Sequence, residues 1–138
     1  MDRSVRVGRP IRVTAALLAS MFLFGACASS SHRDLQVRMR YSKFLPATMT
    51  VPAGTTVSFE IVNQDPIPHE FIIGTAEEQL VHEKGDPNDP HTGPGEASIG
   101  PHETVRLSYT FGHPGTLLYG CHRIGHYAYG MVGTIRVG

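Results

Sequence analysis

The feature of this sequence that most constrains its fold is an alternation of apolar and polar residues that starts at Asp34. Apolar side chains occupy every second position in residues 35–41 and again in 57–61. Successive side chains of a β-strand point to opposite faces, so a period of two predicts strands with one buried face. We expect strands at residues 34–41, 48–51, 55–63, 69–73, 104–111, 115–121 and 131–137.

Turn-forming residues separate these apolar runs at short intervals. The chain has 15 Gly and 10 Pro, and many of them lie between the expected strands, above all in residues 85–101. About seven short strands without a long helical pattern predict an all-β fold, a Greek-key sandwich or small barrel of seven to eight strands. One short helix is expected at residues 75–83, where Thr75 and Glu78 have the spacing of a capping box, and it should cover a sheet edge.

The first 26 residues have the pattern of an export signal. Four arginines precede the apolar stretch 13–26, whose 14 residues are short for a bilayer core of about 30 Å. The end of this stretch has two interpretations: lipidation of Cys27 at a bacterial lipobox, or ordinary signal cleavage. We therefore expect a signal peptide over 1–26, a flexible tether over 27–33 and one folded domain over 34–138.

The charge of the chain changes when the signal segment is set aside. The whole sequence carries 12 basic and 12 acidic residues, whereas residues 27–138 keep 8 basic and 11 acidic ones. A mildly acidic domain argues against nucleic-acid binding. The sequence also lacks a phosphate-binding loop and a Gly-x-Ser-x-Gly motif, so we expect no nucleic-acid partner and no small-molecule substrate.

The strongest chemical signal lies in residues 119–131, where Cys121, His126 and Met131 follow one another as C-x4-H-x4-M. A strand ending at Cys121 and another starting at Met131 would place these side chains at one end of a sandwich, where His69 can join them from a neighbouring strand. A thiolate, two imidazoles and a thioether suit copper that cycles between Cu(I) and Cu(II), whereas zinc prefers four strong ligands. The alternative is a cysteine buried merely as a small apolar residue.

Residues 119–131 resemble the type 1 (blue) copper loop of the cupredoxins, the family of plastocyanin, azurin and pseudoazurin. The similarity extends over residues 34–138, with 44–63 resembling the entry strands and 130–137 the last strand. The resemblance implies that one copper ion is bound by His69, Cys121, His126 and Met131. It also implies an electron carrier, not an enzyme, with a transient redox partner that docks near His126.

Two positions depart from the family pattern. Glu70 stands where many members have asparagine, and Ile124 stands where they have proline before Gly-His. His122 also gives the loop a likeness to multicopper oxidases, in which the residue after the cysteine reaches a trinuclear cluster. Such a cluster needs further His-x-His pairs, but position 120 is glycine and no two of the eight histidines are two residues apart. A trinuclear oxidase is therefore excluded.

Other histidines and apolar residues of the chain are not predicted to bind the metal. Four histidines are interpreted as solvated turn residues outside the metal site: His82, His91, His102 and His113. Four apolar residues are expected to form the docking surface around His126: Leu118, Ile124, Tyr127 and Tyr129.

The sequence thus predicts an exported copper-binding electron carrier in the periplasm or on the extracytoplasmic face of a bacterial membrane. Because Cys27 lies at the predicted processing site, Cys121 would be the only thiol of the folded domain and would have no disulfide partner. Two other functions stay open. One is copper sequestration or delivery by the same fold, and the other is a binding module that does not depend on the metal.

Overall fold

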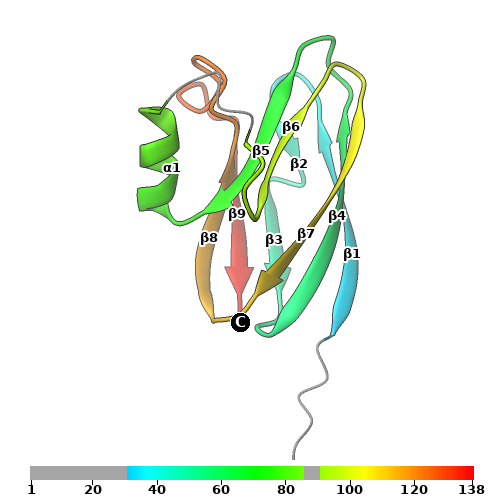
Figure 1. The fold of residues 1–138 in the computed structure, drawn as a ribbon, viewed down its shortest axis with the longest axis vertical. Helices are drawn as coiled ribbons and strands as arrows, with labels where there is room; N and C mark the ends of the chain where they lie inside the picture. Colours follow the sequence, from blue (N-terminus) through cyan, green and yellow to red (C-terminus); the bar gives the residue numbers. More distant parts are fainter. Residues whose placement is uncertain (1–30, 86–90) are drawn as a thin grey trace, which may run out of the picture.

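The computed structural model describes residues 31–85 and 91–138, which form two β-sheets packed face to face and one short helix (Figure 1). The elements are β1 (His32–Met39), β2 (Phe44–Leu45), β3 (Thr48–Val51), β4 (Thr55–Asn63), β5 (His69–Gly74), α1 (Ala76–Glu83), β6 (Glu96–Ile99), β7 (Thr104–Phe111), β8 (Gly115–Gly120) and β9 (Val132–Val137). The predicted signal peptide and the predicted lipidation site Cys27 lie outside the described residues.

The two sheets are connected as a Greek-key sandwich. The first has the strand order β2-β1-β4-β7 and the second β3-β9-β8-β5-β6. β1 pairs with β4 and β3 pairs with β9 in parallel, while the remaining pairs are antiparallel. The chain crosses from one sheet to the other between β2 and β3 and again between β3 and β4, as Greek-key sandwiches do. The all-β sandwich predicted from the alternation is confirmed.

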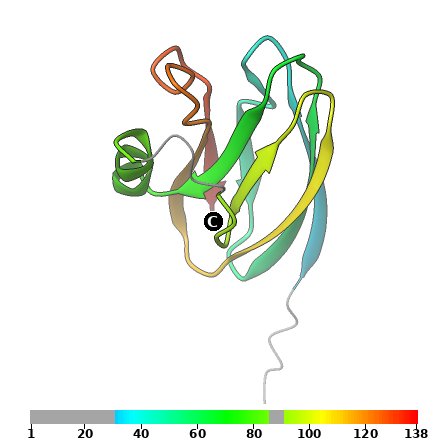
Figure 2. The same cartoon turned by 45° about the horizontal axis from the view of Figure 1, so that its top comes forward.

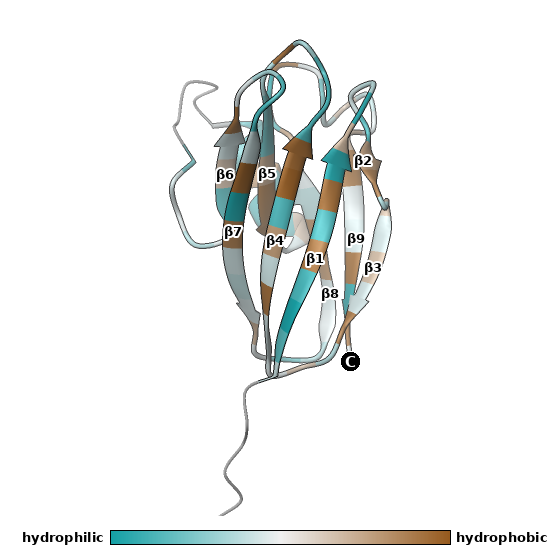
Figure 3. Cartoon of the chain, turned by 90° about the vertical axis from the view of Figure 1, so that its right-hand side faces the viewer, coloured by the Kyte–Doolittle hydropathy of each residue, from teal (hydrophilic) through white to brown (hydrophobic). Residues whose placement is uncertain are grey.

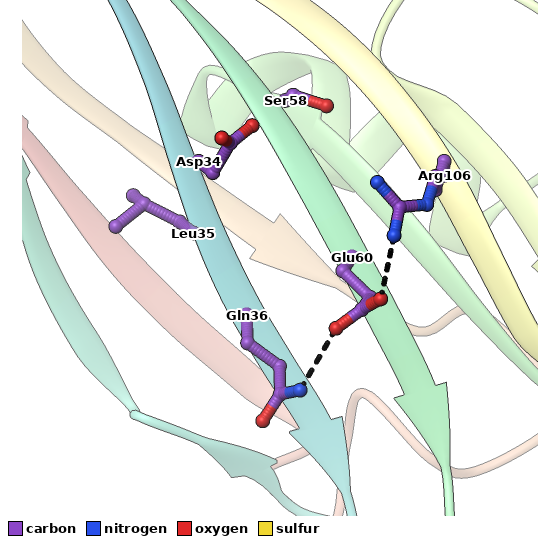
Figure 4. Close-up of a pocket in the computed structure, with 6 residues that line it drawn as sticks. All are labelled: Asp34, Leu35, Gln36, Ser58, Glu60 and Arg106. Carbon is purple, nitrogen blue, oxygen red and sulfur yellow. Dashed lines mark hydrogen bonds and ion pairs between the residues drawn. The ribbon is translucent and has the colours of Figure 1, made fainter.

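Apolar and polar side chains alternate along the strands, so the apolar ones form a core between the two sheets. Every second residue of β4 is buried, and Phe59 of β4 packs against Phe71 of β5 with ring centroids 5.4 Å apart. The outer face of β4 is polar: Gln36 and Arg106 donate hydrogen bonds of 2.9 Å to the two carboxylate oxygens of Glu60 (Figure 4). Apolar and polar bands therefore alternate along the strands of this sheet (Figure 3).

Two short strands lie where the sequence pattern predicted only turns. β2 has two residues, and β6 has four within the Gly/Pro-rich segment 85–101. β6 alternates in burial and pairs with β5 from His69↔Ile99 to Ile72↔Glu96. Its residues Glu-Ala-Ser-Ile include only one residue that favours strands, Ile99, whereas the equally short β3 is Thr-Met-Thr-Val and was predicted. β1 begins at His32, two residues before the predicted start of the domain at 34.

Helix α1 forms where it was predicted, but it does not cover a sheet edge. The amide of Glu78 donates to Thr75 Oγ1 at 3.2 Å and the amide of Thr75 to Glu78 Oε2 at 2.6 Å, so the capping box is confirmed. The helix packs against β5 and β8, which lie inside the second sheet. Gln79, which is fully buried, anchors it by donating to the carbonyl of Ile72 at 2.9 Å.

Three segments lie together at one end of the sandwich: the loop 121–131, the start of β5 and helix α1. The loop lies beside α1 in both ribbon views (Figure 1 and Figure 2), and Figure 1 shows it at the end opposite the C-terminus. Among the described residues, no helix has the length and apolar character needed to cross a membrane.

Candidate metal centre

Three of the four predicted ligands converge at this end of the sandwich. His69 is the first residue of β5, Cys121 follows β8 directly, and His126 lies in the loop between β8 and β9. The two Nδ1 atoms of the histidines are 3.2 Å apart, and Cys121 Sγ lies 3.3 Å from Nδ1 of His126 and 3.9 Å from Nδ1 of His69. His69 and Cys121 are fully buried, while His126 is half-buried.

These distances fit one metal ion between the three donors. An ion about 2.0 Å from each nitrogen and about 2.3 Å from the sulfur, with angles near 120°, keeps the nitrogens about 3.5 Å apart and the sulfur about 3.7 Å from each. The separations in this structure lie within a few tenths of an ångström of those values. The donor set is therefore arranged for a trigonal ion bound by two nitrogens and one sulfur.

Met131, the fourth predicted ligand, is fully buried immediately before β9. Its carbonyl accepts from the amide of Cys121 at 3.2 Å, and its own amide donates to the carbonyl of His126 at 2.9 Å. Within the loop, the amide of His126 donates to the carbonyl of Arg123 at 2.8 Å. Backbone hydrogen bonds thus fix the relative positions of these three predicted ligands.

Asp65 orients the His69 ring. Its Oδ2 lies 2.9 Å from Nε2 of His69, and its carboxylate accepts from the amides of Tyr41 and Ser42 at 2.7 and 2.8 Å. A carboxylate on the outer nitrogen of an imidazole fixes the tautomer that leaves the other nitrogen free for a metal. Burial opposes ionisation of Asp65, but the hydrogen bonds from Ser42, Tyr41 and His69 together hold its pKa below the ordinary value.

Sequence reasoning did not assign this role to Asp65. The one available signal was an acidic residue four positions before the first histidine, and alone it does not distinguish an orienting carboxylate from a turn residue.

The thiol of Cys121 lies in an apolar environment. Burial raises its pKa to about 11, although backbone amides of Arg123 and Glu70 oppose that rise. The amide of Glu70 donates to Sγ at 3.3 Å. The metal-free cysteine is therefore protonated at neutral pH, and binding of a metal ion must release this proton.

Glu70, at the position where the family pattern has asparagine, places a buried carboxylate next to the cysteine. Its side chain is 1% exposed, its Oε1 lies 2.9 Å from Nε of Arg123, and its Oε2 accepts from the amide of His122 at 3.0 Å. Ion pairing with Arg123 compensates part of the cost of burying the charge.

His122 belongs to the helix contact and not to the group of three donors. Its Nε2 lies 2.7 Å from Gln79 Oε1 and its Nδ1 lies 2.9 Å from Glu83 Oε2, both on α1. Its ring stacks on Tyr127 with centroids 4.7 Å apart. His122 therefore connects the ligand loop to the helix.

The predicted apolar surface around His126 is only partly formed. Ile124 and Tyr129 are 86% and 85% exposed in the ligand loop. Tyr127 instead packs against His122, and Leu118 points to the face of β8 opposite Cys121, because strand side chains alternate. Two of the four expected residues thus remain candidates for a docking surface.

The chain is similar to copper proteins in sequence and in fold. It is 32% identical over 114 residues to the copper-resistant cuproprotein CopI of Rubrivivax gelatinosus, covering 80% of this chain and 69% of that protein. Its structure is similar to auracyanin B, with a TM-score of 0.68, 24% identity and coverage of 77% and 88%. Auracyanin A, a "blue" copper protein of Chloroflexus aurantiacus, gives a TM-score of 0.64, 22% identity and coverage of 78% and 100%. Because both identities are at most 24%, the similarity to these two structures shows the fold alone.

The family is shown by a match over most of the chain. Residues 13–123 match the cupredoxin-like domain, a span that includes His69 and Cys121 and ends before His126 and Met131. Together with the two-sheet topology and the relative of 32% identity, this match shows that the chain belongs to the cupredoxin-like family.

Proposed function

We propose that this protein binds one copper ion through His69, Cys121, His126 and Met131 and carries single electrons. The observation that carries the proposal is the convergence of two imidazole nitrogens and one thiol sulfur within 3.9 Å of one another. Copper would supply a one-electron Cu(I)/Cu(II) couple, for which this donor set is suited. The name of the CopI relative, a copper-resistant cuproprotein, supports the choice of metal.

The residues around the proposed ligands support electron transfer because they fix the positions of those ligands. His69 starts a strand and bonds to Asp65, while backbone hydrogen bonds fix Cys121 and Met131. A site that needs little rearrangement between two oxidation states favours fast electron transfer. His126 is the half-buried donor, so a redox partner is proposed to dock on it beside Ile124.

The test is the spectrum and voltammetry of the full protein loaded with copper. We expect one copper per chain, an intense thiolate-to-copper absorption in the visible range and reversible one-electron voltammetry. Absence of the intense absorption from the copper-loaded protein would contradict a type 1 site.

A second candidate is copper sequestration or delivery, which the CopI relative favours. A carrier of electrons should keep its copper through many redox cycles, whereas a protein that delivers copper should exchange it readily with an acceptor. Measuring the exchange of isotopically labelled copper alongside voltammetry separates the two roles.

Glu70→Gln is expected to raise the reduction potential of the copper-loaded protein. A buried negative charge beside the thiolate stabilises the more positive oxidised site, and glutamine removes that charge while still accepting from His122. Because the charge of Arg123 offsets part of the Glu70 charge, the loss of stabilisation of the oxidised site is about 1 kcal/mol. For one electron this raises the potential by roughly 45 mV. Voltammetry measures the shift, and Glu60→Gln on the outer face of the other sheet is the control. A potential that is unchanged or falls would contradict the electrostatic role of Glu70.

Met131→Leu is expected to retain copper and to raise the reduction potential. A thioether is a weak axial ligand that favours the oxidised ion, and leucine fills a similar buried volume without the sulfur. Potentials measured by voltammetry for both proteins check the result. If the two potentials are equal, Met131 is not the axial ligand.

We further propose that residues 1–26 direct export, that residues 34–138 are the functional domain and that Cys27 is lipidated. The site would then act on the extracytoplasmic side of a bacterial membrane, as a carrier without a substrate of its own. Mass spectrometry of the protein recovered from cell membranes tests the lipid on Cys27: an acylated N-terminal cysteine supports it, and an unmodified one contradicts it.

A further inference from the structure

A second group of potential metal ligands lies beside α1. It consists of His82 of α1, His91 and Glu96, the first residue of β6, and its donor atoms lie within 4.8 Å of one another. Nε2 of His82 lies 3.3 Å from Oε1 of Glu96, and Nδ1 of His91 lies 4.0 Å from Oε2 of the same carboxylate. Donors that share one ion are about 3 to 4 Å apart, so small side-chain adjustments suffice to bind one.

Neighbouring groups hold these side chains in place. The amide of Gly93 donates to Oε2 of Glu96 at 3.1 Å. The His82 ring packs against the rings of His122 and His91, with centroids 5.6 and 5.4 Å away.

The carboxylate of Glu70 lies near the outer nitrogen of His91, although farther from it than Asp65 lies from that of His69. Nε2 of His91 lies 3.7 Å from Oε2 of Glu70, while its Nδ1 faces Glu96. An acidic partner on the outer nitrogen is the usual companion of a metal-binding histidine, because it orients the ring and increases its basicity.

The burial of His91 contradicts its interpretation as a solvated turn histidine, and the same interpretation is wrong for His82, which lies in α1. Its side chain is 4% exposed, whereas His82 and Glu96 are 23% and 21% exposed. His82 and His91 also line a cavity of about 250 Å³ that extends to Ile124 of the ligand loop. The group is thus partly enclosed but reachable from solvent, which a site that exchanges metal ions requires.

We propose that His82, His91 and Glu96 form a second metal site, which binds Cu(II). Two imidazoles and a carboxylate lack the soft sulfur that Cu(I) prefers, and among first-row divalent ions such a donor set binds Cu(II) most tightly. Three protein ligands leave a position for water or an exchanging ligand. The site shares no ligand with the proposed electron-transfer centre, and Glu70 lies between the two, with its amide on Cys121 and its carboxylate facing His91.

The experiment adds copper to the full protein in two stages. Copper is first added until the thiolate absorption stops rising, and a further equivalent of Cu(II) is then titrated by calorimetry and electron paramagnetic resonance. We expect one more ion per chain, with a second paramagnetic signal and no further thiolate absorption. His82→Gln and Glu96→Gln should each weaken binding of this second ion at least about tenfold. His113→Gln, an exposed histidine on the turn between β7 and β8, should leave binding unchanged.

Three results would overturn the second site: no additional ion in the parent protein, unchanged binding in both variants, or tighter binding of Zn(II) than of Cu(II) at these residues. An unchanged thiolate absorption in each variant shows that it has folded. A parent protein without the thiolate absorption would contradict the proposed electron-transfer centre. The second site is tested separately, by the second paramagnetic signal and by its loss in the variants.

Discussion

Replacing Cys121 by serine is expected to abolish the intense visible absorption of the copper-loaded protein and to weaken copper binding at least about 100-fold. The absorption arises from charge transfer between a thiolate and copper, and a serine hydroxyl provides neither the sulfur nor a negative charge at neutral pH. His69 and His126 would remain as a two-nitrogen site, for which only a weak spectrum is expected. Absorption spectra and competitive copper titrations of the two proteins check both parts.

The serine variant should fold, which makes the comparison informative. Cys121 is fully buried, but a serine Oγ can accept the hydrogen bond that the Glu70 amide now donates to Sγ. Thermal unfolding of the metal-free proteins is the control, with an expected loss of about 1 kcal/mol for a buried hydroxyl. A folded serine variant that keeps the intense absorption would show that Cys121 is not the copper ligand.

The sequence predicted the strands best where alternation of apolar and polar residues coincides with residues that favour strands. β4 and β7 coincide with the predicted ranges because eight or nine residues give a clear period of two. β6 was missed because, of its residues Glu-Ala-Ser-Ile, only Ile99 favours strands, whereas the equally short β3, with the residues Thr-Met-Thr-Val, was predicted at 48–51. The position of α1 over inner strands was also not predictable, because it depends on Gln79 reaching the carbonyl of Ile72 and the ring of His122.

The sequence identifies the predicted ligands by their spacing, but it does not identify the residues that surround them. Cys121, His126 and Met131 lie within eleven residues, so their spacing carried the prediction, and the structure brings His69 to the same place. Asp65 and Glu70 contact the centre through geometry that no spacing rule encodes. His82 and Glu96 are 14 residues apart, and only the folded chain places them beside each other.

Gly133→Ala is expected to destabilise the protein by about 3 kcal/mol or more. Gly133 of β9 pairs with Tyr119 of β8, and a methyl group there would overlap Cζ and the hydroxyl oxygen of that tyrosine. The ring cannot move aside easily: it is fully buried, packs against Phe44 and Phe71, and donates its hydroxyl to the carbonyl of Pro46. The cost combines overpacking with loss of a buried hydrogen bond. Chemical denaturation of the metal-free protein measures the change.

Gly112→Ala is the matched control, because nothing lies within 4 Å of the added methyl group. Both substitutions reduce the freedom of the unfolded chain equally, which by itself stabilises by about 0.4 to 1 kcal/mol, so the difference between them isolates the clash with Tyr119. Because Tyr119 lies two residues before Cys121 and Gly133 two residues after Met131, Gly133→Ala should also weaken copper binding, and Gly112→Ala should not. Equal stabilities for the two variants would mean that the tyrosine ring does not hold the ends of β8 and β9, and the rigidity of the copper site would then depend on the loop hydrogen bonds alone.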